Sequence, residues 1–226
     1  MLADWFLYVS VTFAALLPIA NPFSTAPVFI SLTRRFPARR RALQARMSAV
    51  YMGCILLVSL FAGALILSFF GITLPILRIA GGLVIAKVGF GMLESKQEPL
   101  SPEPSDEGHG LDDVAFTPIA MPMLSGPGSI ALTIAMATQT TGLVSYAGVA
   151  TGIVLVALLS WLILHYSSAI LDFIGTTGMD ALTRIMGLLL VCVGIQFVAT
   201  GFIEGLTGDR VTGILRDWLM TLQATE

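Results

Sequence analysis

The chain has 226 residues, of which 56% are hydrophobic and 12% are charged, and its mean hydropathy is +0.88. Soluble domains carry about 25% charged residues, so this composition excludes a chain that covers itself with a polar surface. The formal net charge of −2 gives no sign of a nucleic-acid partner. We therefore expect an all-α membrane protein with a single transmembrane domain, 1–226, surrounded by the lipid bilayer.

Six segments are predicted to cross the membrane, because each holds about 20 mostly apolar residues, the length that a transmembrane helix needs. They cover residues 5–32, 45–70, 75–94, 114–137, 143–165 and 182–203. Residues 95–113, rich in proline and carboxylates, are predicted to form a flexible linker, since this composition cannot bury a core. Residues 209–226 place apolar side chains at helical spacing, which predicts an amphipathic C-terminal helix on the membrane surface.

The basic residues gather in the connection between the first and second spans. Six of the twelve Lys and Arg residues lie there, namely Arg34, Arg35, Arg39, Arg40, Arg41 and Arg46. The positive-inside rule places such a connection in the cytoplasm. With six spans, we then expect the N-terminus, the turn around Thr141 and the C-terminus to lie outside.

A proline-rich segment occurs twice in the chain. Residues 18–22, Pro-Ile-Ala-Asn-Pro, are followed by Pro27, and 100 residues later 118–122, Pro-Ile-Ala-Met-Pro, are followed by Pro127. A repeat at a fixed offset indicates a duplicated structural unit.

A second matching pair of segments supports the duplication. Six residues from Arg78 resemble six residues from Arg184, at an offset of 106. Since each half holds three spans, the second half enters the membrane from the opposite side. We therefore predict two inverted three-helix repeats, 1–94 and 114–208, an architecture typical of secondary transporters.

The repeated prolines predict that the first and fourth helices are broken. A proline inside a helix lacks the N–H donor and clashes with the carbonyl four residues earlier. Unpaired backbone groups are costly in lipid, so broken helices occur where they are buried in protein or line a polar cavity. We expect half-helices to resume after Pro27 and Pro127, and the two breaks to face each other near the bilayer midplane.

Small polar residues around the breaks favour a solute site. The predicted substrate-binding residues are Asn21, Pro22, Ser24, Thr25, Pro27, Ser125, Gly126, Pro127, Gly128, Ser129 and, in the sixth span, Gln196. The N–H groups of the resuming half-helices suit a carboxylate, and the released carbonyls suit an ammonium group, so a zwitterionic amino acid matches both. The alternative is that the prolines and glycines only kink and pack the helices, and that Gln196 ties helices together.

Three cationic residues are candidates for gating or coupling: Arg78, Lys87 and Arg184. Charges within spans are often functional. The alternatives are that the Lys87 side chain extends to the membrane surface and that the two arginines are interface anchors.

The proline segments also resemble the signatures of a known family. Residues 21–29, NPFSTAPVF, resemble the MarC-family signature NPxGxxPxF, with Ser24 in place of the glycine. Residues 118–130 resemble the second MarC signature, and 184–196 its last-helix motif. The resemblance implies a six-helix protein of the bacterial inner membrane, within the LysE-type transporter group that moves amino acids and related solutes. Some MarC relatives are described as transporters of small neutral amino acids such as glycine and alanine.

These observations predict a secondary transporter of a small polar solute that works by alternating access, and the resemblance implies glycine or alanine as its substrate. A non-transporting scaffold or assembly subunit, or a transporter of another metabolite or drug, remains the alternative. With two histidines, no HExxH or GxSxG motif and no paired carboxylates in the spans, we predict no catalytic residue, metal or cofactor. Glycines four residues apart at 148 and 152, and at 201 and 205, permit close helix packing, including in a homo-oligomer.

Overall fold

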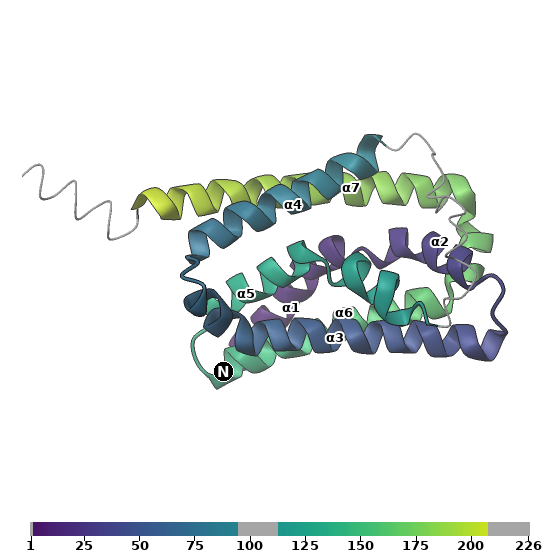
Figure 1. The fold of residues 1–226 in the computed structure, drawn as a ribbon, viewed down its shortest axis with the longest axis horizontal. Coiled ribbons are helices and arrows are strands. Elements are labelled where there is room, and N and C mark those ends of the chain that lie inside the picture. Colours follow the sequence, from purple (N-terminus) through teal and green to yellow (C-terminus); the bar gives the residue numbers. More distant parts are fainter. Residues whose placement is uncertain (1, 95–112, 208–226) are drawn as a thin grey trace, which may run out of the picture.

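The computed structural model describes residues 2–94 and 113–207, and every element in these two ranges is helical (Figure 1). The elements are α1 (Leu2–Ala20), α2 (Pro22–Thr33), α3 (Ala38–Phe69), α4 (Leu74–Glu94), the π-helical segment η2 (Ala115–Leu124), α5 (Pro127–Gln139), α6 (Leu143–His165) and α7 (Ser167–Thr207). The predicted C-terminal helix and nearly all of the predicted linker lie outside the described residues.

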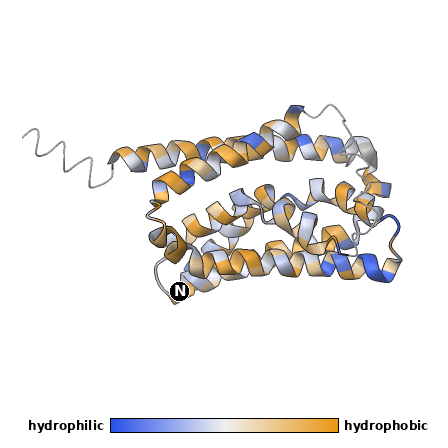
Figure 2. Ribbon diagram, in the orientation of Figure 1, coloured by the Kyte–Doolittle hydropathy of each residue, from blue (hydrophilic) through white to orange (hydrophobic). Residues whose placement is uncertain are grey.

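The described helices have the length and composition of membrane spans. Five are long and apolar enough to cross a bilayer, and a sixth results if η2 and α5, which are bent by 61°, form one span. Apolar residues cover most of the ribbon (Figure 2). Large apolar side chains also face outward, for example Phe61 at 68% and Leu65 at 72% exposure. Such a surface is suited to lipid rather than water.

Several predicted helix boundaries agree closely with the structure. The spans predicted at 75–94 and 143–165 correspond to α4 and α6. The span predicted from residue 45 begins earlier, because α3 starts at Ala38. The arginine-rich stretch that follows Ala38 consists largely of good helix formers, which explains the additional turns.

The last helix is longer than the predicted span 182–203. It runs from Ser167 to Thr207 with a kink at Gly175, whose φ of 72° interrupts the helical backbone. A positive φ carries no steric penalty at glycine. Gly175 is thus the one non-helical residue within α7, and the chain changes direction there.

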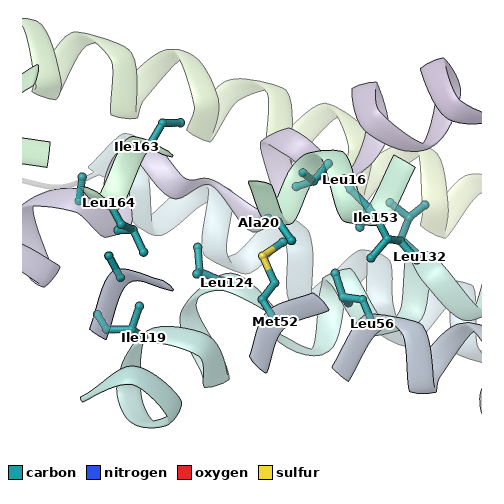
Figure 3. Packing of buried hydrophobic residues seen from close by; sticks show 14 of the residues in the cluster. Leu16, Ala20, Met52, Leu56, Ile119, Leu124, Leu132, Ile153, Ile163 and Leu164 are labelled. Carbon is teal, nitrogen blue, oxygen red and sulfur yellow. The ribbon is translucent and has the colours of Figure 1, made fainter. Parts of the chain in front are cut away.

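The helices form two layers in Figure 1. In one layer α4 packs along α7, and in the other α6 packs against both α1 and α3. The segments that follow the breaks connect the layers, since α2 packs against α7 and α5 packs against α4. A shared core includes Leu16, Ala20, Met52, Leu56, Ile119, Leu124 and Ile153 (Figure 3).

Candidate functional site

The first helix break lies at Asn21, between α1 and α2. Asn21 has left-handed backbone angles, with φ 41° and ψ 62°. Proline disfavours a right-handed helical conformation in the residue before it, and asparagine adopts the left-handed region more readily than most residues. Asn21 before Pro22 therefore provides the local chemistry for this break.

The second half-helix begins earlier than predicted from the sequence. We expected the helix to resume after Pro27, but α2 starts at Pro22 and contains Pro27 in its interior. That prediction was wrong because Pro22 occupies the first helical turn, where a missing N–H costs nothing. Pro27 still has no N–H to offer the carbonyl of Phe23, so α2 keeps one gap in its hydrogen-bond ladder.

The Asn21 side chain is buried, with 5% exposure. Its Oδ1 accepts a hydrogen bond of 3.3 Å from the Ser24 N–H, which caps α2. Its Nδ2 donates to the Met92 sulfur of α4 at 3.4 Å. Thioether sulfur is a weak acceptor, so a stronger acceptor would compete well for this amide donor.

The second break extends over the whole of η2. Thr117 (φ −120°, ψ 126°) and Met121 (φ −130°, ψ 123°) are extended, and each precedes a proline, as the steric restriction on such residues requires. The extended Gly126 then precedes α5, which starts at Pro127. The expected broken fourth helix is therefore present, and here the half-helix begins at the predicted proline.

Three buried hydroxyl groups at the breaks bond to backbone carbonyls. Thr25 Oγ1 donates to the carbonyl of Asn21 at 3.2 Å. Ser125 Oγ donates to the carbonyl of Ala120 at 2.7 Å, and Ser129 Oγ to that of Leu124 at 3.3 Å. Buried carbonyls need such partners where a helix ladder is interrupted. In this conformation the hydroxyl groups predicted to meet a solute stabilise the broken backbone itself.

The fold brings the two breaks together. A Cβ on Gly128, in the first turn of α5, would lie 3.3 Å from Ile19 Cγ2 of α1 and 2.5 Å from Ile85 Cγ1 of α4. Figure 3 shows Ala20 and Leu124 on either side of the Met52 side chain. Ile85 lies near the middle of α4, whereas the Asn21 partner Met92 lies near its end. The breaks therefore occupy the region between the middle and the C-terminal end of α4.

The other predicted binding residues differ in burial. Pro22 and Gly128 are buried, Ser24, Pro27 and Gly126 are half-buried, and Pro127 is exposed. Gln196 is also exposed, so its side chain is not buried between the helices. The buried face of α7 carries Gly187, Val191 and Gly194 at helical spacing, and a residue two positions after Gly194 points to the other side of the helix.

The three gating candidates are placed very differently. Arg78 has 3% exposure and forms an ion pair with Glu204 of α7, whose side chain is 40% exposed. Lys87 and Arg184 have exposed side chains. Among the three, Arg78 alone is buried in the interface between α4 and α7.

Comparison with known sequences identifies the family. The sequence model described as "MarC family integral membrane protein" matches residues 6–206, a range that contains both breaks. The chain belongs to the MarC family. The resemblance seen in the proline segments is thus confirmed.

Curated MarC proteins match over nearly their full length. The UPF0056 inner membrane protein MarC of Escherichia coli (strain K12) is 38% identical over 213 residues, which cover 89% of this chain and 96% of that protein. The protein of the same name from Shigella flexneri has the same identity and coverage. These MarC relatives are named inner membrane proteins, and the described helices of this chain have the matching apolar character. No solved structure matches the chain.

Two contacts of this MarC-family chain were not predicted from its sequence. Glu204 follows the predicted end of the sixth span by one residue, and its partner Arg78 is 126 positions away. Met92 lies 71 positions from Asn21. The available signal for the first contact was a carboxylate at the end of an apolar helix, which needs a cationic partner.

Proposed function

We propose that this MarC-family protein is a secondary transporter of a small polar solute, with small neutral amino acids such as glycine or alanine as the substrate class. The single observation that carries the proposal is that two helix breaks, 100 residues apart in sequence, lie against each other inside the helix bundle. Helix packing alone does not require such interruptions. A transporter gains from them polar backbone groups at membrane depth.

The arrangement of helices supports an inverted repeat of two three-span halves. If α1–α2, α3 and α4 correspond to η2–α5, α6 and α7, then the packing of α1 on α6 corresponds to that of η2–α5 on α3. Likewise, α2 on α7 corresponds to α5 on α4. The pairs α4 with α7 and α3 with α6 each map onto themselves under this correspondence.

The glycines of α4 and α7 refine the offset between the halves. Gly82 faces Gly194, and Gly89 faces Gly187. A shift of 105 residues carries Gly82 onto Gly187 (187 − 82 = 105) and Gly89 onto Gly194 (194 − 89 = 105). The exchange of both contacts supports 105 rather than the 106 inferred from the arginine segments.

The chemistry of the breaks favours a neutral, zwitterionic solute. Residues 117–129 and 18–27 contain no formally charged side chain. The first turn of α5 offers backbone N–H groups at the buried residues Gly128 and Ser129, suited to a carboxylate. Asn21 offers an Nδ2 donor whose present acceptor is a sulfur atom.

Alternating access requires that the site be closed on one side at a time. Arg78 and Glu204 join the start of α4 to the end of α7. Met92, the partner of Asn21, is fourteen residues further along α4, or roughly 21 Å. We propose that the paired ends of α4 and α7, held together by this ion pair, move as a unit to close the end of the protein away from Asn21, which is the outer end in the predicted orientation.

Transport in proteoliposomes tests the proposal. Purified protein is reconstituted and the uptake of radiolabelled glycine, alanine and serine is measured with and without an imposed pH gradient. We expect saturable uptake of at least one of them, lowered about fivefold by Ser125→Ala, since a buried hydrogen bond contributes about 1 kcal/mol. The matched control is Ser10→Ala, which removes an exposed hydroxyl that also bonds a backbone carbonyl. Absence of uptake by folded protein for all three solutes would favour the scaffold alternative.

A further inference from the structure

A groove of about 580 Å³ opens at the arginine-rich end of the protein, between the start of α3 and the last turn of α6. Its lining includes Arg39, Arg40, Leu43, Arg46, Trp161 and His165. Figure 2 shows the strongly hydrophilic connection between α2 and α3 at this end. The transport site proposed above does not use the groove.

The groove is suited to an anion. Three guanidinium groups line it, and no carboxylate belongs to the described lining. Arg40 is also held in place by the Phe36 ring, whose centroid lies 4.5 Å from its Cζ. The planar fork of arginine donors matches the oxygens of a phosphate group.

The groove is also partly apolar. Leu43 and Trp161 belong to its lining, and tryptophan is enriched where membrane meets water. The antiparallel packing of α3 on α6, seen where Gly53 faces Ala157, places Val50 and Leu158 deeper along the same interface. These two side chains are 49% and 48% exposed. An apolar seam therefore continues from the cationic groove toward the membrane interior.

We propose that this groove binds an anionic phospholipid of the cytoplasmic leaflet. Its phosphodiester headgroup contacts Arg39 and Arg46, and an acyl chain lies along Val50 and Leu158. The combination of a cationic head site and an apolar seam selects an amphiphile over a free anion. Basic pockets between transmembrane helices on the cytoplasmic side are a known mode of anionic lipid recognition.

The test compares two double variants that remove the same charge from the same connection. The first, Arg39→Gln with Arg46→Gln, removes two positive side chains from the groove lining. Arg34→Gln with Arg35→Gln changes exposed arginines outside the groove lining. Binding of phosphatidylglycerol and of phosphatidylcholine with identical acyl chains is measured by native mass spectrometry of the purified full chain, with size-exclusion profiles as the check of folding.

We expect the groove variant to bind phosphatidylglycerol at least about tenfold more weakly, since each cation near the membrane surface contributes measurably to anionic lipid binding. The control variant stays within about twofold of the unmodified protein. Inorganic phosphate at millimolar concentration does not displace the lipid. Equal losses in both variants, equal binding of the two lipids, or displacement by phosphate would each overturn the proposal.

Discussion

Gly82 of α4 and Gly194 of α7 face each other backbone to backbone. A Cβ on Gly82 would lie 2.6 Å from the carbonyl oxygen of Gly194, and one on Gly194 would lie 2.6 Å from the carbonyl oxygen of Gly82. The same relationship holds for Gly89, where a Cβ would lie 2.7 Å from the carbonyl oxygen of Gly187. Small residues allow this close approach of helices in membranes, where van der Waals packing drives association.

The glycine contact predicts a large difference between two substitutions in α4. Gly82→Ala places a methyl group against backbone that cannot rotate away, so we expect a loss of about 1–3 kcal/mol in unfolding free energy. Gly91→Ala has no atom within 4 Å of the new Cβ and gains up to about 1 kcal/mol of helix propensity. Thermal unfolding followed by size exclusion measures both variants. If Gly82→Ala is as stable as Gly91→Ala, the close packing of α4 on α7 is wrong.

Two substitutions at Asn21 separate its backbone role from its side-chain role. Asn21→Ala keeps a Cβ in the left-handed region without the local hydrogen bonding that helps asparagine adopt it, which costs up to about 1–2 kcal/mol, and removes the cap, worth about 1 kcal/mol. Asn21→Gly tolerates the backbone angles, so we expect it to be nearly as stable as the unmodified protein. Both variants remove the amide and should lower uptake at least tenfold. Normal uptake by Asn21→Gly would show that the amide does not contact the solute.

The ion pair between Arg78 and Glu204 predicts that removing its carboxylate lowers the free energy of unfolding, whereas removing an exposed charge from α4 does not. Glu204→Gln leaves a buried guanidinium without its carboxylate, and we expect a cost of about 1–3 kcal/mol, below the value for a fully buried pair because Glu204 is 40% exposed. The control, Lys87→Gln, removes an exposed cation from the same helix and should change stability by less than about 0.5 kcal/mol.

A charge exchange completes this test. In the double variant Arg78→Glu with Glu204→Arg, the two charges can pair again, so stability should recover part of what each single variant loses. Additive losses in the double variant would mean that the two side chains do not interact.

The predicted orientation is tested by cysteine labelling. The native Cys54 and Cys192 are exposed, so both are first replaced by alanine. In intact cells, a membrane-impermeant maleimide should then label Thr141→Cys but not Arg35→Cys, because the positive-inside rule places the arginine-rich connection in the cytoplasm. Labelling of Arg35→Cys alone would reverse the assignment of inside and outside.

The helix ends and the helix breaks could be predicted from the sequence because both depend on local chemistry. Apolar runs define the ends of α4 and α6, because burial in a bilayer depends on local composition. The break before Pro22 and the irregular backbone before Pro118 and Pro122 follow from the steric effect of proline on the preceding residue.

Contacts between distant segments could not be predicted in this way. The burial of Arg78 depends on Glu204, 126 positions away. The exposure of Gln196 depends on which face of α7 carries the glycines that contact α4. Ser125 was predicted to meet a solute, but a hydroxyl can bond equally well to a nearby carbonyl, and in this conformation it bonds to that of Ala120.

The close seam between α4 and α7 has a mechanical consequence. The backbones of α4 and α7 are in direct contact at Gly82 and Gly89, with no layer of side chains between them that could rearrange. We therefore expect α4 and α7 to move together as one rigid unit. Helix α4 comes from the first half of the sequence and α7 from the second, and both helix breaks lie outside this pair. For the transport cycle proposed above, we therefore expect α4 and α7 to move as a pair against the remaining helices, rather than one sequence half against the other.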